Sequence, residues 1–276
     1  MRYMELGSSG IQVSKMGLGT WAIGGGPAWS GGPSEQNAVD TIVEAVKQGI
    51  NMVDTAPGYN FGASEGIVGK ALKRVDREKV ILVTKCGVVW NRKGTVWNKV
   101  GDRQLYRLLT PESVKLEVEE SLDRLGTDYI DLYMTHWPSV PPFETPIAET
   151  VGALNELKTD GKIRAIGAAN VSISQIKEYV DCCELDLVQG KYSVLDRCCR
   201  CAARTRSRCR RTRRSSRACS PAPSLGTPAP SRATLVPTRS GGSRATWSAS
   251  STCSTSGSRF ATSTTAPSRR CALPGS

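Results

Sequence analysis

Residues 50–75, INMVDTAPGYNFGASEGIVGKALKRV, contain the local pattern that decides the fold. The stretch begins with INMVDTA, a short apolar run of the kind found in buried strands. A polar segment with Gly and Pro follows, and SEGIVGKALKRV then spaces its apolar residues as a helix does. A strand joined to a helix by a short loop is the βα unit of a parallel sheet. The stretch therefore predicts one βα unit of an α/β protein.

The same alternation continues on both sides of this stretch. The predicted strands are VSKMGLGT (13–20), INMVDTA (50–56), VILVTK (80–85), IDLYMTH (130–136), IRAIGAA (163–169) and LDLVQGKYS (185–193). The predicted helices cover residues 34–49, 64–75, 110–126, 146–161 and 172–180. Cap residues agree with these bounds: Ser34, Ser64 and Thr110 stand at helix starts, and Gly49, Gly126 and Gly161 stand just past helix ends.

Unusual polar residues follow the C-terminal ends of the predicted strands, one for each strand. They are Thr20, Asp54, Lys85, His136, Asn170 and Gln189. A (β/α)8 barrel builds its site from the βα loops along this one edge, whereas an open doubly wound sheet concentrates its ligand contacts at a single switch point. We therefore predict an α/β fold, a (β/α)8 TIM barrel of which about six βα units are readable in residues 1–197.

Three segments invite other interpretations. Residues 17–22, GLGTWA, match the dinucleotide pattern G-x-G-x-x-A, but that motif must open a helix and the next predicted helix begins only at Ser34. The Trp-rich residues 88–106 are too polar for a strand, so we expect a loop that covers the site or is merely structural. Cys182 and Cys183 close a predicted helix, where we expect them only to pack.

The composition changes after Arg197. The chain has 37 Lys and Arg against 25 Asp and Glu, yet residues 198–276 hold 15 Arg and no Lys, Asp or Glu. Residues 1–197 are therefore mildly acidic, with a formal net charge of −3, and the whole chain is not a basic nucleic-acid binder. No run approaches the ~18 apolar residues of a membrane helix, and the N-terminus has no signal-peptide core. We expect a cytoplasmic protein without a membrane partner.

Residues 198–276 contain too few large apolar side chains to offset the entropy of ordering the chain. Three interpretations remain open: a disordered Arg- and Ser-rich tail, a cysteine-rich metal module, and translation in a shifted reading frame. A metal module needs spaced ligand pairs, which the cluster Cys198, Cys199 and Cys201 does not supply, so we expect no metal. With suitable synonymous codons, one frame offset conceals IAVQAYSPLEQGLLT behind residues 207–221 and RDKYNCTIPAL behind residues 261–271. We therefore favour the frameshift.

The residue types at the predicted strand ends suit proton donation to a carbonyl. His136 is the only histidine; a lone His is structural more often than not, but this one lies level with Asp54 and Lys85. A buried Lys85 needs an anion, and Asp54 on the adjacent strand is the natural one. Tyr59 follows Asp54 by five residues, so its hydroxyl can return over the barrel mouth, where a nearby ammonium lowers a tyrosine pKa. Such a Tyr, beside a Lys and a neutral His, can act as a general acid toward a carbonyl oxygen.

Four motifs, MGLGTWAIGGG, DTAPGYNFGASE, VTKCG and YMTHWP, resemble those of the aldo-keto reductases. These are (β/α)8 enzymes that reduce aldehydes and ketones with NAD(P)H, and the resemblance extends over about residues 3–197. Within the family the sequence is similar to bacterial reductases of small aldehydes such as methylglyoxal. The resemblance implies that the family's catalytic tetrad falls on Asp54, Tyr59, Lys85 and His136. Tyr59 would then be the general acid that Lys85 tunes, while Asp54 holds Lys85 and His136 orients the carbonyl.

The resemblance also implies a cofactor, NADPH or NADH. The positions that match the family's cofactor contacts are Gly19, Thr20, Trp21, Asp54, Asn170 and Gln189. Ala169 stands where the family usually has a Ser, which places one hydrogen bond in question. The family's seventh-strand motif and eighth-strand loop supply the remaining cofactor contacts, and neither is readable here. We therefore expect the chain as written to be impaired in cofactor binding.

The leading hypothesis is an NAD(P)H-dependent oxidoreductase that reduces small aldehydes and ketones. Two alternatives stay open: a non-catalytic cofactor-binding barrel that acts as a sensor or channel-subunit-like module, and an Arg-rich tail that binds nucleic acid non-specifically. We expect no specific nucleic-acid partner. We divide the chain into a barrel part, 1–197, and a tail, 198–276, in which we expect irregular structure, no seventh or eighth barrel strand, and aggregation as a result. The physiological substrate, the choice of NADP or NAD, and the oligomeric state stay undetermined.

Overall fold

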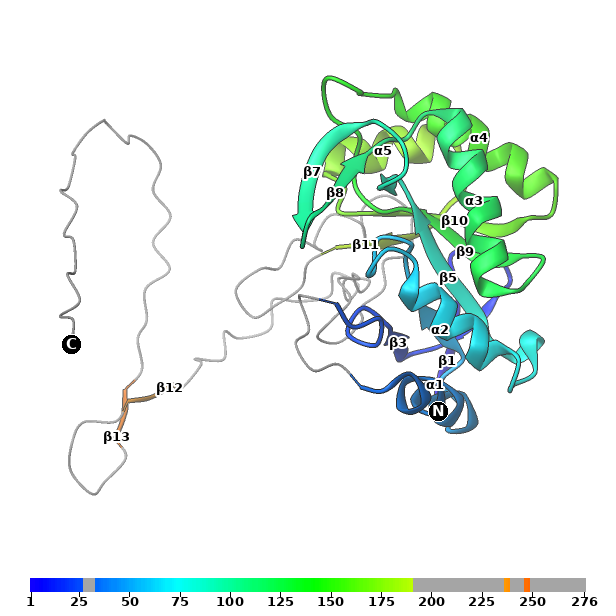
Figure 1. Ribbon diagram of the computed structural model, residues 1–276, viewed down its shortest axis with the longest axis vertical. Helices are drawn as coiled ribbons and strands as arrows, with labels where there is room; N and C mark the ends of the chain where they lie inside the picture. The colour runs from blue at the N-terminus through cyan, green and yellow to red at the C-terminus, as the bar shows by residue number, and fades with distance from the viewer. Residues whose placement is uncertain (27–32, 191–235, 239–245, 249–276) are drawn as a thin grey trace, which may run out of the picture. The chain divides into compact units, whose positions relative to one another are not determined.

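The computed structural model describes residues 1–26 and 33–190, together with two short strands at 236–238 and 246–248 (Figure 1). The chain divides into two compact units, residues 1–223 and 224–276. The predicted domain boundary at residue 197 lies outside the described residues, as does nearly all of the predicted tail.

Six parallel strands form the central sheet of the first unit, in the order β3-β4-β5-β9-β10-β11. Their bounds are Gly17–Gly19, Met52–Asp54, Ile81–Cys86, Ile130–Thr135, Ile163–Ala169 and Leu185–Gln189. The strands are neighbours in the sheet in the same order as they occur in the chain, and every neighbouring pair is parallel. A doubly wound sheet would reverse its strand order at a switch point, and this sheet does not. The α/β prediction, with six strands in barrel order, is confirmed.

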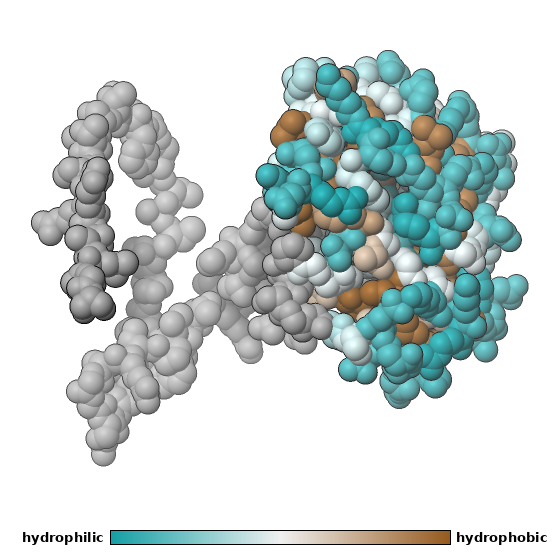
Figure 2. Space-filling view, viewed as in Figure 1, coloured by the Kyte–Doolittle hydropathy of each residue, from teal (hydrophilic) through white to brown (hydrophobic). Residues whose placement is uncertain are grey.

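Helices connect the strands and cover one face of the sheet (Figure 1). They are α1 (Glu35–Lys47), α2 (Ala63–Leu72), α3 (Pro111–Leu125), α4 (Ile147–Thr159) and α5 (Ile173–Cys182), with a short 3-10 helix, η1, at Arg77–Lys79. In the view of Figure 2 their outer surface is largely hydrophilic, as expected for helices that bury one stripe. No helix in the described part of the chain is both long enough and apolar enough to cross a membrane.

Capping residues set most helix bounds where the sequence predicts them. The Thr110 side chain accepts a hydrogen bond from the Ser113 N–H, Pro111 follows at the first helical position, and Gly126 ends α3 in the left-handed conformation at φ 63°. Ser64 is an exception. Helix α2 begins at Ala63, so Ser64 lies inside the first turn, and its hydroxyl is buried instead of capping.

Two apolar clusters lie on opposite faces of the sheet because side chains alternate along each strand. In β9, Tyr133 packs toward the helices, whereas its sequence neighbours Leu132 and Met134 belong to the cluster on the inner face. The inner cluster continues into an N-terminal antiparallel hairpin, β1 (Tyr3–Glu5) and β2 (Gln12–Ser14). The predicted strand 13–20 is therefore wrong as a single element, since its start belongs to this hairpin and only Gly17–Gly19 joins the parallel sheet.

Residues 88–107 form a second, antiparallel sheet, which corrects the prediction that this segment is too polar for strands. Its strands are β6 (Val88–Val89), β7 (Thr95–Val100) and β8 (Arg103–Arg107), in the order β6-β8-β7. Gly101, at φ 60°, makes the turn between β7 and β8. Along β7, Thr95, Trp97 and Val100 are part-buried, whereas Val96, Asn98 and Lys99 are exposed.

Two further predictions concern residues 17–22 and the region after residue 190. Gly17–Gly19 is a strand and the next residues form turns, so GLGTWA opens no helix and the Rossmann interpretation is excluded. Beyond residue 190, β12 (Val236–Thr238) and β13 (Thr246–Ser248) pair with each other in an antiparallel sheet of their own. These six residues are the part of the predicted tail that the structure describes, and among the described strands none extends the six-stranded sheet.

Candidate active site

A hydrogen-bonded chain of three side chains crosses the C-terminal edge of the sheet. Asp54 ends β4, Lys85 lies near the end of β5, and the Lys85 ammonium forms a short ion pair with Asp54 Oδ1. Lys85 Nζ also donates to the Thr55 carbonyl at 2.7 Å and to the Tyr59 hydroxyl at 3.3 Å. Lys85 is 1% exposed, and its ammonium group binds all three of these acceptors. Burial opposes the charge of Lys85, but Asp54 and Tyr59 outweigh it and raise the pKa of this ammonium above its usual value.

The loop after β4 holds Tyr59 through its backbone. The Tyr59 N–H donates to the Ala56 carbonyl at 3.1 Å, and the next three residues, Asn60, Phe61 and Gly62, have φ values of 51°, 55° and 86°. A left-handed Phe is unusual and costs on the order of 1 kcal/mol, so other contacts must hold this turn. The Asn60 amide supplies one such contact by donating to the Gly24 carbonyl at 2.9 Å. A strained turn fixed in this way is typical of a functional loop.

His136 follows β9 and lies beside Tyr59. The two ring centroids are 5.7 Å apart and the rings meet edge to face at 82°. The His136 N–H donates to the Cys86 carbonyl at 2.9 Å, and its own carbonyl accepts from the Asn170 amide at 2.8 Å. Neighbouring strand ends therefore fix the backbone of His136 on both sides. The structure thus brings Asp54, Tyr59, Lys85 and His136 together, as the sequence predicts.

Asn170 and Gln189 place two carboxamides at the ends of β10 and β11. Asn170 is left-handed at φ 60°, a conformation that Asn tolerates better than most residues, and its N–H donates to the Gln189 carbonyl at 2.8 Å. The Gln189 side chain donates to Asp54 Oδ2 at 2.8 Å, so Lys85 and Gln189 bind different oxygens of the same carboxylate. This bond ties the last described strand of the sheet to β4, across the face of the site.

Gly19, Thr20 and Trp21 lie where β3 ends. The Thr20 side chain is fully buried, and its hydroxyl bonds to Ser64 Oγ at 2.7 Å and donates to the Asp54 carbonyl at 3.1 Å. Thr20 therefore braces the loop from inside. Trp21 is 40% exposed, and its ring centroid lies 6.3 Å from that of Tyr59. Of these three residues, Trp21 presents a large apolar surface next to the site.

Two further side chains border or brace the site: Trp97, from the segment expected to cover the site, and Glu117, which sequence reasoning missed. Trp97, on β7, lies with its ring centroid 6.4 Å from that of His136, so the small antiparallel sheet does border the site. Glu117 on α3 is 2% exposed and accepts from the Gly87 N–H at 2.8 Å, which fixes the chain just after β5. Burial raises the pKa of Glu117 to about 8. The sequence signal for Glu117 was a Glu on the apolar face of the helix predicted for residues 110–126.

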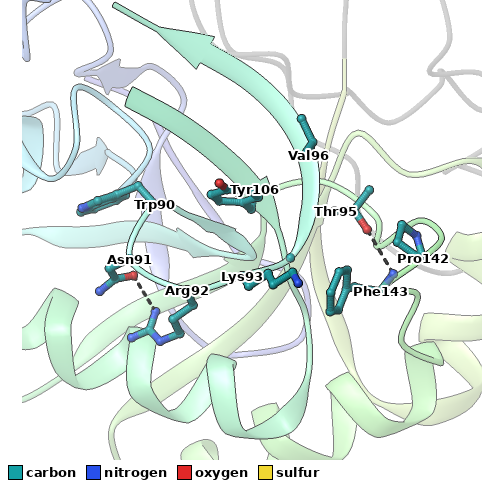
Figure 3. Close-up of a pocket in the computed structure, with 10 residues that line it drawn as sticks. Trp90, Asn91, Arg92, Lys93, Thr95, Val96, Tyr106, Pro142 and Phe143 are labelled. Atoms are coloured by element: carbon teal, nitrogen blue, oxygen red, sulfur yellow. Dashed lines mark hydrogen bonds between the residues drawn. The ribbon is translucent and has the colours of Figure 1, made fainter. Parts of the chain in front are cut away.

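The opposite face of the small sheet lines a separate cavity of about 780 Å³ (Figure 3). Val96 and Tyr106, which pair across β7 and β8, face this cavity together with Trp90 and Phe143. The Phe143 N–H donates to Thr95 Oγ1 at 3.2 Å and closes one side. None of the four predicted catalytic residues lines the cavity. Within residues 1–26 and 33–190, no group of three or more His, Cys, Asp or Glu side chains is placed to hold a metal ion.

Comparison with known proteins agrees with this geometry. Residues 15–208 match the model of the aldo/keto reductase family. The NADH-specific methylglyoxal reductase of Escherichia coli (strain K12) is 65% identical over 197 residues, which are 71% of this chain and 60% of that protein. An aldo-keto reductase of Bacillus subtilis (strain 168) is 44% identical over 198 residues, 71% of this chain and 55% of that protein. The chain thus spans little more than half the length of these relatives.

Solved structures show the same likeness. The glycerol dehydrogenase of Gluconobacter oxydans superposes with a TM-score of 0.62 at 37% identity, over 74% of this chain and 58% of that one. An aldo-keto reductase of Klebsiella pneumoniae in complex with NADPH gives a TM-score of 0.57 at 27% identity, over 71% and 60% of the two chains. The family match, the sheet in barrel order and the edge of polar side chains lead to one conclusion: the chain belongs to the aldo/keto reductase family.

Proposed function

We propose that this protein is the catalytic part of an NAD(P)H-dependent reductase of small aldehydes and ketones, with Tyr59 as its general acid. The observation that carries the proposal is the Asp54–Lys85–Tyr59 chain, which ends on a part-buried hydroxyl beside His136. The relative from Escherichia coli is a methylglyoxal reductase, which points to a small dicarbonyl compound as the first substrate to test.

Each side chain then has a distinct task in proton transfer. The Lys85 ammonium, 3.3 Å from the Tyr59 oxygen, stabilises the phenolate that remains when Tyr59 donates its proton to the carbonyl oxygen. Asp54 keeps Lys85 charged inside the protein, because a buried ammonium without an anion would lose its proton. His136 lies at the edge of the Tyr59 ring and orients the same carbonyl oxygen. When bound, NAD(P)H supplies the hydride.

The described residues suit the nicotinamide end of such a cofactor. Asn170 and Gln189 present carboxamides, whose donors and acceptors complement the carboxamide of nicotinamide, and Trp21 offers an aromatic surface beside Tyr59. Gly19 and the buried Thr20 shape the strand end beneath them. The groups that would bind the phosphates and the adenosine lie outside the described residues. We therefore propose that the chain as written binds NADPH or NADH weakly, because the sequence after Arg197 carries no readable family motif for those contacts.

The test compares two proteins: the 276-residue chain, and the same chain continued after Arg197 in the frame that contains IAVQAYSPLEQGLLT. The second should oxidise NADH or NADPH when methylglyoxal is added, and the first should bind either cofactor far more weakly in a fluorescence titration. A restored chain that binds cofactor but reduces no aldehyde would instead support a non-catalytic cofactor-binding barrel. Micromolar cofactor affinity of the 276-residue chain, about −8 kcal/mol, would contradict the proposed impairment.

We also propose a cytoplasmic location. The three cysteines of the described region, Cys86, Cys182 and Cys183, are free thiols, which agrees with a reducing compartment. Cys86 is buried and Cys183 is half-buried, whereas Cys182 is exposed. The prediction that both cysteines of the helix end only pack therefore holds for Cys183 and is wrong for Cys182. Labelling of Cys182 by a thiol reagent without prior reduction is the expected result for protein purified from the cytoplasm.

A further inference from the structure

Arg107 places a cation next to the candidate active site. It ends β8, where its backbone pairs with Val88 on one side and Thr95 on the other. Its guanidinium carbon lies 4.9 Å from the ring centroid of Trp137 and 5.5 Å from that of Trp97. Trp97 is in turn 6.4 Å from the His136 ring. The two indoles therefore connect the guanidinium to the residue that faces the substrate carbonyl.

The Arg107 side chain has no anionic partner among the described residues. Its Nε atom is buried without a hydrogen bond, and burial lowers the pKa of this guanidinium because no carboxylate compensates. Other part-buried arginines differ: Arg77 binds Asp131 at 2.9 Å, and Arg124 binds Glu65 at 2.6 Å. A buried N–H without an acceptor is unfavourable, so an unfilled site of this kind points to an acceptor that arrives with a ligand.

The rest of the sequence offers almost no alternative carboxylate. Outside the described ranges the sequence has a single carboxylate side chain, Asp196, and residues 198–276 have none. The backbone of Arg107 is also closely held, because a Cβ on Gly94 would lie 2.5 Å from the Arg107 carbonyl oxygen. The small sheet therefore holds the backbone of Arg107 in a fixed position.

We propose that Arg107 binds the carboxylate of the substrate, so that the preferred substrates are aldehydes that also carry a carboxylate group. This inference deepens the proposed function and rests on it. A guanidinium is a planar fork of donors that matches a carboxylate with two parallel hydrogen bonds. The indoles of Trp97 and Trp137 can pack against a flat organic group that joins the carbonyl at Tyr59 to the carboxylate at Arg107. The selected class is a rigid or aromatic aldehyde acid.

The experiment compares 4-carboxybenzaldehyde with its neutral methyl ester, methyl 4-formylbenzoate, in a ligand-observed NMR titration of the full chain. Arg107→Gln should raise the Kd of the acid by about 10- to 100-fold and leave that of the ester within about twofold. Arg103→Gln is the matched control: it removes the same charge from the same strand, but its guanidinium lies 3.8 Å over Phe61, away from the two indoles. It should change neither Kd, and because both variants remove one positive charge, a general electrostatic effect on the acid would appear equally in both.

Further variants separate the possible outcomes. Arg107→Lys keeps the charge but loses the fork, and should recover only part of the affinity for the acid; it also replaces Arg107→Gln if that variant does not fold. Asp196→Asn should change nothing, and a large gain in acid affinity on that substitution would identify Asp196 as the internal partner of Arg107 and overturn the inference. Equal losses for acid and ester in Arg107→Gln would overturn it too, as would a wild-type chain that binds neither probe.

Binding also distinguishes this inference from the proposed function. In the restored chain, preferential binding of the acid without any reduction would contradict the reductase proposal and leave Arg107 as an anion site. Reduction of both aldehydes with equal kcat/KM, unchanged in Arg107→Gln, would support the reductase and contradict the role of Arg107. The joint expectation is reduction of both, with a kcat/KM advantage for the acid that Arg107→Gln removes.

Discussion

The two ends of the parallel sheet both bury a carboxylate, yet they use it differently. At the N-terminal end, Asp131 accepts from Arg77 at 2.9 Å, from Arg164 at 2.7 Å and from the Leu82 N–H at 3.0 Å. At the C-terminal end, Asp54 binds Lys85 and Gln189, and Lys85 passes the interaction on to Tyr59. Every partner of Asp131 stabilises the fold, whereas the chain from Asp54 ends on the part-buried hydroxyl of Tyr59.

The difference follows from how such a sheet is connected. Loops at the C-terminal ends of the strands lead into the helices and vary freely, so side chains placed there can face a ligand. At the opposite end the carboxylate of Asp131 lies between β5, β9 and β10 and holds their starts together. A buried ion pair is therefore not a functional signal by itself. The signal is a buried pair with one further group that remains accessible.

The largest expected effect is on the accessible group. In the restored chain, Tyr59→Phe should reduce the turnover of methylglyoxal by ~10²–10⁴-fold, because it removes the general acid, while the thermal midpoint changes little. Tyr179→Phe is the matched control. The Tyr179 hydroxyl is buried and bonds to Thr135 Oγ1 at 2.9 Å, and it lies on the helix side of the sheet. Near-normal turnover in Tyr59→Phe, measured at equal cofactor saturation, would refute the mechanism.

The second effect separates the two carboxylates directly. Asp131→Asn should lower the free energy of unfolding by ~2–4 kcal/mol, because it leaves Arg77 without its anion; the half-exposed Arg164 loses less. Turnover per folded molecule should persist. Asp54→Asn should abolish turnover even where the protein is fully folded, since Lys85 loses the anion that keeps it charged. Urea denaturation together with turnover measures both. Equal losses of turnover in the two variants would contradict the proposed difference between the two ends of the sheet.

The third effect is a pH dependence produced by Glu117, which braces the end of β5. Burial raises the pKa of Glu117 from 4.5 to about 8, so between these values the folded protein holds a proton that the unfolded chain has released. Stability should therefore fall as the pH rises through this window, by a few kcal/mol at most. Glu117→Gln stays neutral and should flatten the profile of urea midpoints between pH 5 and pH 9. Glu112→Gln, at an exposed position of the same helix, should leave the profile unchanged.

Local chemistry explains which parts of the structure the sequence could predict. Ser34 and Thr110 cap helices because their own side chains bind the first turn, and such contacts are visible in a few residues of sequence. The order of the parallel strands and the meeting of Asp54, Lys85 and His136 followed from where polar residues end apolar runs. The assignments of Asp54, Tyr59, Lys85, His136, Asn170 and Gln189 to catalysis and cofactor binding remain proposals.

Long-range pairing explains what was missed. Residues 95–107 are polar in sequence, yet β7 and β8 are stabilised by pairing with each other, and the turn at Gly101 brings Val96 opposite Tyr106. Ser64 looks like a cap, but its hydroxyl bonds to Thr20, 44 residues away. The contact of Arg107 with two indoles from different elements likewise has no local signature. Each of these features depends on contacts that the sequence alone does not bring together.

The smallest expected effect tests whether distance or solvent decides the value of an ion pair. Lys70 on α2 lies 2.6 Å from Glu35 on α1, closer than Arg77 is to Asp131, but the two side chains are 55% and 59% exposed. Water screens this pair, and ordering two long side chains opposes it, so a double-mutant cycle of Glu35→Gln and Lys70→Met should give a coupling of ~0.2–1 kcal/mol. The coupling should disappear in about 0.5 M salt, where the Debye length is shorter than 5 Å. A coupling above about 2 kcal/mol that resists salt would mean that the distance between the charges, and not their burial, decides the strength of both the Lys70–Glu35 and the Arg77–Asp131 pair.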